Sequence, residues 1–251
     1  MVDMSPQRIG SGADEIAVEI TPGKGPPILW LGGFRSDMTG SKALRLAQWG
    51  AEKGRKVVRF DYRGHGASSG TFEDFVLSDW LADAEMVMGR FCDEAPVAVG
   101  SSMGGWIGLL LAKACLARGR PLAGLVLIAP AADFTERLML PRLPEAARKT
   151  LAEEGRVDIP SNYDAPYTVT ARLFEDGRQH LLYTDDMIDV GCPVHILQGV
   201  EDDAVPYGHT LELVERLAHD DVVLTLVKDG DHRLSREADL ARLIAAVEGL
   251  V

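Results

Sequence analysis

The chain has 251 residues, of which 46% are hydrophobic and 25% charged, a composition typical of a globular protein that can bury a full core. Its formal net charge of −12 argues against binding to nucleic acid or to an anionic membrane surface. No apolar run reaches the roughly 20 residues that a membrane-spanning helix needs, and residues 1–12 lack the apolar stretch of a signal peptide. We therefore expect a cytoplasmic protein without a membrane span. The three cysteines have apolar neighbours, and we expect them to be reduced, partly buried thiols.

Strands and helices are predicted to alternate along the chain. The apolar patterns indicate strands at residues 15–20, 27–31, 56–60, 97–99, 122–129, 194–199 and 222–227. Helical spacing falls at residues 41–53, 75–91, 103–117, 207–218 and 236–247. This alternation favours an α/β fold with a mostly parallel central sheet and helices on both faces. Residues 15–20 alternate as an edge strand does, whereas 122–129 are apolar enough to be buried on both faces.

One segment, residues 131–190, interrupts the alternation. A single crossover between parallel strands needs only about a dozen residues, and this segment is several times longer. It contains four prolines and two predicted helices, at residues 145–154 and 169–182. We expect a core formed by residues 1–130 and 191–251, and a small helical cap formed by 131–190 over the carboxyl ends of the strands. A peripheral insertion without a role at the site is the alternative.

The pattern G-x-S-x-G occurs twice, and its context separates the two matches. Residues 100–104 (GSSMG) end a predicted strand and begin a predicted helix, which is the arrangement of a nucleophile elbow. Residues 66–70 (GASSG) lie in a polar stretch that no apolar helix follows. We therefore predict that Ser102 is a nucleophile and that Ser68 is a loop residue.

A serine nucleophile needs a base and an acid that orients the base. His232 follows the last predicted strand in a short loop, and we predict that it is the base; His65, in the loop after residues 56–60, is the weaker candidate. For the acid we choose Asp202, which follows the strand at 194–199, over its neighbour Asp203. Asp133 occupies the other place in such a fold where an acid can occur, and Asp231 is too close to His232 in sequence to orient it easily. His195 is expected to be packed within a strand, and His180, His209 and His219 to lie on helix surfaces.

Acyl transfer also needs two backbone N–H groups that stabilise an oxyanion. We predict that these belong to Met103, which follows the nucleophile, and to Phe34, in the glycine-containing loop after the strand at 27–31. The glycines at 32 and 33 let this loop pass close to a substrate.

Five motifs together resemble the α/β-hydrolase superfamily in order and spacing, at residues 32–34, 61–68, 100–105, 199–206 and 230–232. Three stretches are similar to a narrower group, namely 33–44 (GFRSDM, then Gly40 and KAL), 100–106 (GSSMGGW) and 231–233 (DHR). That group comprises a mitochondrial palmitoyl-protein thioesterase that also hydrolyses acyl glucuronides, and its bacterial relatives. The resemblance implies an esterase or thioesterase whose catalytic triad is Ser102, Asp202 and His232. Gly32 departs from the superfamily, since many members have His there.

The expected reaction is the hydrolysis of a carboxylic ester or thioester through an acyl-enzyme. The expected partner is a small-molecule acyl ester or thioester, or an acylated protein, and neither a cofactor nor a metal is predicted. Peptidase, lactonase and C–C hydrolase chemistry are alternatives on the same fold, and a noncatalytic ligand receptor is a further one. Five apolar residues of the 131–190 segment line an acyl pocket or form the core of the cap: Leu138, Met139, Leu140, Leu143 and Phe174.

Overall fold

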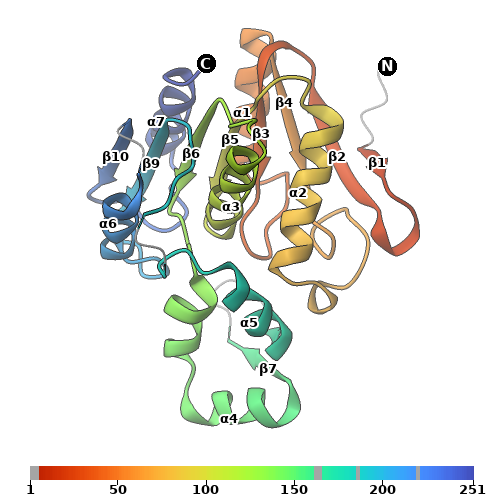
Figure 1. Ribbon diagram of the computed structural model, residues 1–251, viewed down its shortest axis with the longest axis vertical. Helices are drawn as coiled ribbons and strands as arrows, with labels where there is room; N and C mark the ends of the chain where they lie inside the picture. The colour runs from red at the N-terminus through yellow and green to blue at the C-terminus, as the bar shows by residue number, and fades with distance from the viewer. Residues whose placement is uncertain (1–5, 161–165, 185–186, 219–220) are drawn as a thin grey trace.

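The computed structural model describes residues 6–160, 166–184, 187–218 and 221–251. Its central feature is an eight-stranded sheet of order β1-β2-β4-β3-β5-β6-β9-β10 (Figure 1). The strands are β1 (Gln7–Ile9), β2 (Ile16–Thr21), β3 (Lys24–Leu31), β4 (Arg55–Phe60), β5 (Val97–Ser101), β6 (Gly124–Ile128), β9 (Val194–Gly199) and β10 (Val222–Val227). Neighbouring strands from β4 to β10 in this order pair in parallel, which confirms the predicted fold class.

The amino-terminal side of the sheet differs from the prediction. β2 pairs antiparallel with both β4 and β1, so it is an inner strand and the prediction of an edge strand at residues 15–20 is wrong. The short strand β1 covers the free hydrogen-bonding side of β2, with Arg8 opposite Ala17. The polar pattern of residues 7–9 gave no signal for this strand.

Helices cover both faces of the sheet, as predicted. Helices α1 (Ser41–Lys53) and α7 (Glu237–Glu248) pack on one face. On the other face lie α2 (Leu77–Phe91), α3 (Met103–Ala117) and α6 (Tyr207–Arg216). Alternate residues of each strand therefore enter two separate cores, for example Leu29 on the α3 face and Ile28 on the α1 face. All five residues of β6 are buried, as expected for a strand covered on both sides.

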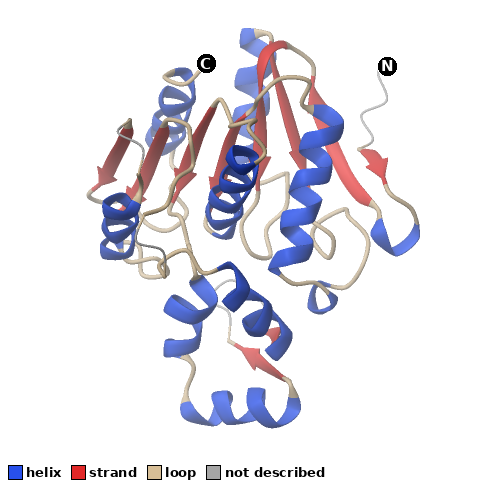
Figure 2. Ribbon diagram, in the orientation of Figure 1, coloured by secondary structure: helices blue, strands red, loops and turns tan. Residues whose placement is uncertain are grey.

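The segment between β6 and β9 lies beyond the carboxyl ends of the parallel strands (Figure 1). It contains two short helical turns (Thr135–Met139 and Leu140–Arg142), α4 (Glu145–Glu154), the antiparallel pair β7 (Arg156–Ile159) and β8 (Tyr167–Thr170), α5 (Ala171–Gly177) and a final turn (Arg178–His180). Figure 2 shows the strands of this pair among the helices of the segment. The segment is therefore not purely helical, which corrects the prediction.

The predicted helix at residues 169–182 is also wrong at its start. Residues up to Thr170 belong to β8, and α5 begins only at Ala171. Thr170 ends the extended backbone and its hydroxyl accepts a hydrogen bond from Leu173 N–H at 3.3 Å, which is a helix N-cap. No helix in the described parts of the chain is both long and apolar enough to cross a membrane.

Candidate active site

Ser102 lies at a sharp turn between β5 and α3, with a φ of 56° that non-glycine residues rarely adopt. Two backbone hydrogen bonds hold this turn against the end of β6. Ser102 N–H donates to the Ile128 carbonyl at 2.9 Å, and the Ser102 carbonyl accepts from Ala131 N–H at 3.1 Å. The strained backbone conformation is therefore fixed from both sides, as expected at a functional residue.

The two glycines of the pattern are needed for close backbone approach. A Cβ atom on Gly100 would overlap the carbonyl of Gly104, and one on Gly104 would overlap the carbonyl of Leu31. Any side chain at these positions would push the elbow away from β3 and from its own helix. The glycines thus allow the turn to be tight enough to present Ser102 at the edge of the sheet.

His232 and Asp202 lie beside Ser102, although the three residues are far apart in sequence. Nε2 of His232 is 3.1 Å from Ser102 Oγ, and Nδ1 of His232 is 2.8 Å from Asp202 Oδ2. A neutral imidazole that donates from Nδ1 to the carboxylate leaves a lone pair on Nε2 facing the hydroxyl. The geometry is that of a serine, a base and an orienting acid.

The Asp202 carboxylate is held by its own loop and by the strand before it. Oδ1 accepts hydrogen bonds from Ala204 N–H at 2.9 Å and Val205 N–H at 2.8 Å. Gln198 Nε2 lies 3.2 Å from Oδ2, and Gln198 Oε1 accepts from the Thr210 hydroxyl at 2.7 Å. The side chain of Asp202 is completely buried. Sequence reasoning missed Gln198, whose polar side chain in a buried strand was the available signal.

The other candidate acids lie elsewhere. Asp203 is exposed, and Asp231 is exposed and accepts a hydrogen bond from Leu234 N–H at 3.0 Å. Asp133 is buried, and its carboxylate accepts hydrogen bonds from Leu182 N–H and Tyr183 N–H at 2.8 to 3.0 Å. It therefore joins the two ends of the 131–190 segment.

The loop that carries His232 is anchored to α1. Lys42 Nζ donates a hydrogen bond to the carbonyl of Arg233, the residue after the histidine. Burial lowers the pKa of the Lys42 amino group to about 8, and the Asp231 carboxylate opposes part of this shift. The Lys42 contact, which the sequence did not predict, fixes the backbone next to His232.

The loop after β3 presents Phe34 beside the elbow. The Gly33 carbonyl accepts hydrogen bonds from Ser36 N–H at 3.1 Å and from the Ser36 hydroxyl at 2.9 Å. Because the Gly33–Phe34 peptide bond is trans, its N–H points away from these donors. A Cβ on Gly33 would lie 3.5 Å from that of Ser102, so the loop is in contact range of the elbow. Of the residues that the structure describes, none accepts a hydrogen bond from Phe34 N–H or Met103 N–H.

The ring of Phe34 belongs to an aromatic cluster at the border of the 131–190 segment. Its centroid lies 4.9 Å from Phe72, 5.4 Å from Phe134 and 5.9 Å from Tyr167. Of the apolar residues considered for an acyl pocket, Leu143 and Phe174 are buried in the core. Leu138, Met139 and Leu140 are only partly buried and pack against that core.

Ser68, His65 and His195 lie outside the triad. Ser68 lies in a loop, as predicted, and His65 is buried in the same loop. His195 is half-buried in β9 with Nε2 3.1 Å from the Thr225 hydroxyl, consistent with a packed strand residue.

Two predictions of surface histidines are not met. His209 is only 8% exposed; its Nε2 lies 2.9 Å from the Ala132 carbonyl, and burial lowers its pKa to about 4. His180 is half-buried, with Nε2 2.7 Å from the Ser78 hydroxyl. Each ring makes a contact between the 131–190 segment and the core: His209 of α6 contacts Ala132, and His180 of the segment contacts Ser78 of α2. A helical pattern alone could not indicate these contacts. His219 lies outside the described residues.

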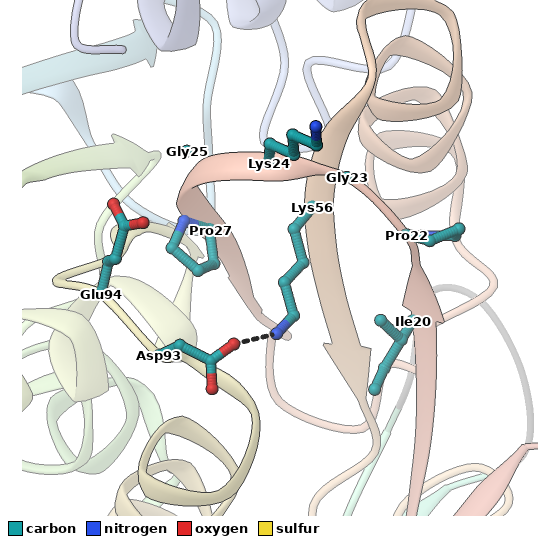
Figure 3. A pocket seen from close by; sticks show the side chains of 9 residues that line it. All are labelled: Ile20, Pro22, Gly23, Lys24, Gly25, Pro27, Lys56, Asp93 and Glu94. Atoms are coloured by element: carbon teal, nitrogen blue, oxygen red, sulfur yellow. Dashed lines mark hydrogen bonds and ion pairs between the residues drawn. The ribbon is translucent and has the colours of Figure 1, made fainter.

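A pocket on the opposite edge of the sheet is separate from this site. Figure 3 shows its lining, which includes Lys24, Lys56 and Asp93 at or near the amino ends of β3, β4 and β5. Lys56 and Asp93 form an ion pair at 2.9 Å across it. Ser102 lies at the carboxyl end of β5, so the pocket contributes nothing to the elbow.

The three cysteines are free thiols, and two of them, Cys115 and Cys192, are buried, as predicted.

Comparison with known proteins identifies relatives over nearly the whole chain. A model of the alpha/beta hydrolase family matches residues 28–246. The human mitochondrial palmitoyl-protein thioesterase ABHD10 is 32% identical over 238 residues, which are 94% of this chain and 76% of that protein. A solved structure of a putative hydrolase from Agrobacterium vitis S4 has a TM-score of 0.92 and 47% identity, covering 98% of this chain and 97% of that one. The structure of mouse ABHD10 has a TM-score of 0.87 and 30% identity, covering 98% of each chain.

These relatives confirm the predicted resemblance and the predicted class of enzyme. The matches extend through the elbow, the Asp202 loop and the His232 loop, because the family model covers all three. The chain therefore belongs to the alpha/beta hydrolase family, and within it to the esterase- and thioesterase-type enzymes that include the palmitoyl-protein thioesterase ABHD10.

Proposed function

We propose that this enzyme hydrolyses carboxylic esters or thioesters through a covalent acyl-enzyme on Ser102. The observation that carries the proposal is the continuous chain of contacts from Ser102 Oγ to His232 Nε2 at 3.1 Å and from His232 Nδ1 to Asp202 Oδ2 at 2.8 Å. A serine hydroxyl is a weak nucleophile at neutral pH, and this chain supplies the base that takes its proton and the acid that fixes the tautomer of that base.

In the first half of the reaction, Ser102 Oγ attacks the acyl carbon while His232 Nε2 accepts the hydroxyl proton. The carbonyl π electrons move onto oxygen and form a tetrahedral oxyanion. When the oxyanion collapses, the bond to the leaving alcohol or thiol breaks, and His232 returns the proton to it. Asp202 stabilises the imidazolium that exists between these two transfers.

In the second half, a water molecule gives its proton to His232 and attacks the acyl-enzyme. Collapse of the second oxyanion releases the carboxylic acid and returns the proton to Ser102 Oγ. Both halves use only side chains and backbone groups of the enzyme and a water molecule, so the proposal includes no cofactor.

The oxyanion is assigned to the N–H groups of Phe34 and Met103. Met103 is the first residue of α3, where N–H groups have no partner within the helix and the helix dipole favours negative charge. The Phe34 N–H is oriented by the two hydrogen bonds on the carbonyl of the same peptide group. Donors that are fixed before the reaction stabilise the developing charge without reorganisation.

The substrate side of the proposal rests on the segment of residues 131–190. We propose that this segment acts as a cap on the core formed by 1–130 and 191–251, and that its partly exposed apolar residues Leu138, Met139 and Leu140 contact the acyl chain. The name of ABHD10 as a palmitoyl-protein thioesterase supports an acyl thioester or an acylated protein as substrate. That relative is mitochondrial by name, and a cytoplasmic location for this chain remains a prediction.

The test combines covalent labelling with a substrate panel. The purified enzyme is expected to hydrolyse p-nitrophenyl esters and to be labelled by a fluorophosphonate on Ser102, as located by peptide mass spectrometry. Ser102→Ala should abolish the label and reduce kcat by roughly 10⁵- to 10⁶-fold, since the rest of the triad acts only through this oxygen. Full activity of Ser102→Ala, or a label on Ser68, would refute the proposal. A chain-length series of esters, acyl thioesters and amides then identifies the preferred bond and acyl size.

A further inference from the structure

We infer that Arg142, in the 131–190 segment, is a positioning residue for the catalytic acid, because its guanidinium holds the peptide group that binds the Asp202 carboxylate. The inference rests on the proposed function through the role given to Asp202. It gives the 131–190 segment a part in the chemistry that is separate from any contact with the acyl chain.

The peptide group between Ala204 and Val205 lies between the two side chains. Its N–H, which belongs to Val205, donates to Asp202 Oδ1 at 2.8 Å. Its carbonyl, which belongs to Ala204, accepts from Arg142 Nη1 at 2.9 Å. Because the peptide bond is planar and trans, the carbonyl and the N–H point in opposite directions and rotate together. A rotation that breaks the contact with Arg142 therefore also moves the N–H that holds Asp202.

The core holds the peptide groups on either side of this one. On the preceding side, Ala204 N–H donates to Asp202 Oδ1 at 2.9 Å. On the following side, the Val205 carbonyl accepts from Gln198 Nε2 at 3.0 Å. The carbonyl between them is bound by Arg142, from the 131–190 segment. The segment thus completes the set of contacts that fixes three successive peptide groups of the Asp202 loop.

The backbone that carries Arg142 is itself held in place. Arg142 ends a short helical turn that contains Pro141, whose ring fixes its φ. Leu143, the next residue, is buried and its N–H donates to the Leu140 carbonyl at 3.3 Å. Arg148 donates to the carbonyls on both sides of Arg142, at 3.2 Å to Pro141 and 2.9 Å to Leu143. The guanidinium therefore extends from a fixed backbone, which lowers the conformational entropy lost in making its contact.

The contact affects the acid in two ways. Asp202 must direct Oδ2 at His232 Nδ1, 2.8 Å away, and the hydrogen bonds to Oδ1 set the orientation of the carboxylate. A charged donor on a carbonyl also polarises the amide group, so the N–H at its other end becomes a stronger donor. Both effects concern the imidazolium that each half of the reaction forms, so they apply to every substrate.

A second arginine joins the same segment to the core at a different place. Arg137 Nη1 donates to Glu212 Oε1 of α6 at 3.1 Å, and the guanidinium lies 4.0 Å from the ring centroid of Tyr183. Arg137 thus attaches the segment to α6, whereas Arg142 attaches it to the Asp202 loop. Comparing the two arginines separates attachment of the segment from positioning of the acid.

The first test is Arg142→Met, which keeps an unbranched apolar side chain but removes the charge and the donor. We expect kcat on p-nitrophenyl acetate, whose acyl group is short, to fall by about 3- to 10-fold with KM changed less than twofold, because a charge-assisted hydrogen bond at the surface has modest strength. The same fall is expected on p-nitrophenyl octanoate. A melting curve checks that the variant is folded. An unchanged kcat in a folded variant, or a fall confined to the octanoate, would overturn the inference.

Arg137→Met is the matched control, because it releases the same segment from α6. Its kcat on the acetate should stay within about twofold of the wild type. Equal losses in the two variants would show that kcat follows attachment of the segment in general, and would overturn the role of Arg142.

The second test asks whether Arg142 acts through Asp202. In the Asp202→Ala background no carboxylate remains to be positioned, so Arg142→Met should change the residual kcat, measured above that of Ser102→Ala, by less than about twofold. The same fold-loss with and without the carboxylate would overturn the inference. If Arg142→Met does not fold, Arg142→Gln, which is shorter and uncharged, replaces it in both tests and the same outcomes decide.

These outcomes are distinct from failure of the proposed function. Activity that survives Ser102→Ala would refute the triad whatever Arg142 does. Activity that requires Ser102 and Asp202 but is indifferent to Arg142→Met would leave the triad intact and remove only the role of Arg142.

Discussion

The two G-x-S-x-G stretches of this chain have the same pattern and opposite surroundings. Ser102, in 100–104, lies between a buried strand and a buried helix with a φ of 56°. Ser68, in 66–70, lies in a loop where two glycines, Gly66 and Gly70, rather than the serine, have positive φ. The positive φ therefore falls on the serine in the first stretch, where it is strained, and on glycines in the second, which adopt it without strain.

The two hydroxyl groups also differ in what they contact. Ser102 Oγ lies against His232 Nε2, whereas Ser68 Oγ donates to the Asp61 carbonyl at 2.6 Å and accepts from Ala17 N–H at 2.8 Å. The Ser68 hydroxyl is thus fully used in joining its loop to β2. The comparison shows that the five-residue pattern specifies a compact turn, and that the elements on either side decide whether the serine faces a base.

The largest effect is expected at Asp202, the acid that orients the base next to Ser102. Asp202→Asn keeps the size of the side chain but removes the charge that fixes the Nδ1–H tautomer and stabilises the imidazolium. We expect kcat to fall by roughly 10³- to 10⁴-fold, measured on a p-nitrophenyl ester at pH 8. Asp203→Asn is the matched control on the adjacent, exposed residue and should stay within about twofold of the wild type. Equal losses in the two variants would contradict the assignment of Asp202.

Much of the fold was predictable because its signals are local and apolar. The run of apolar residues at 122–129 and the helical spacing at 41–53 depend only on burial against a sheet, and β6 and α1 lie there. The pair β7–β8 was not predictable in this way. Its residues are mostly exposed or half-buried, and a short hairpin of this kind is stabilised by cross-strand pairing and by the neighbouring helices.

The candidate site was likewise predictable only in part. Ser102, Asp202 and His232 follow predicted strands, and parallel strands bring their carboxyl ends to one edge, so their proximity could be predicted from order alone. The contacts of Lys42 with the Arg233 carbonyl and of His65 Nε2 with Arg35 N–H could not, because each side chain reaches an element distant in sequence. Gln198 contacts residues closer in sequence, Asp202 and Thr210, and only its polar character in a buried strand indicated a role. His209 shows the same limit, since its place in a helix gave no sign of the Ala132 carbonyl that it contacts.

The next largest effect is a loss of stability at acidic pH. It arises from His65, which lies in the same loop as Ser68. The pKa of His65 is near 6.5 in the unfolded chain and is lowered to about 4 in the folded enzyme, mainly by burial. Below pH 6.5 the unfolded state binds a proton that the folded state does not, so stability falls as the pH falls to about 4. The loss from this group amounts to about 3 kcal/mol at most.

The measurement is urea unfolding of the wild type and His65→Phe between pH 7 and pH 4. The stability difference between the two should shrink as the pH falls, because the variant lacks this titration. His209, whose pKa is also lowered to about 4 by burial, contributes a separate loss that both proteins share. A difference that stays constant with pH would show that folding does not lower the pKa of His65.

The smallest effect is expected at Ser68 itself, and it is an effect on stability. Ser68→Ala leaves Ala17 N–H, on a residue with no exposed surface, without its acceptor, and leaves the Asp61 carbonyl without a donor. Such unpaired groups cost about 1 to 3 kcal/mol, which urea unfolding at pH 7 would measure. Ser69→Ala is the matched control, because Ser69 forms its hydrogen bonds with its backbone: its N–H donates to the Glu15 carbonyl at 2.9 Å and its carbonyl accepts from Gly64 N–H at 2.8 Å. This variant should change stability by less than about 0.5 kcal/mol. Activity should stay within a few-fold of the wild type, since Asp61 and His65 can still accept hydrogen bonds from Met38 N–H and Arg35 N–H, in the chain that follows Phe34. A folded Ser68→Ala enzyme as inactive as Ser102→Ala would mean that the second stretch takes part in the chemistry, and the contrast between the two serines would no longer hold.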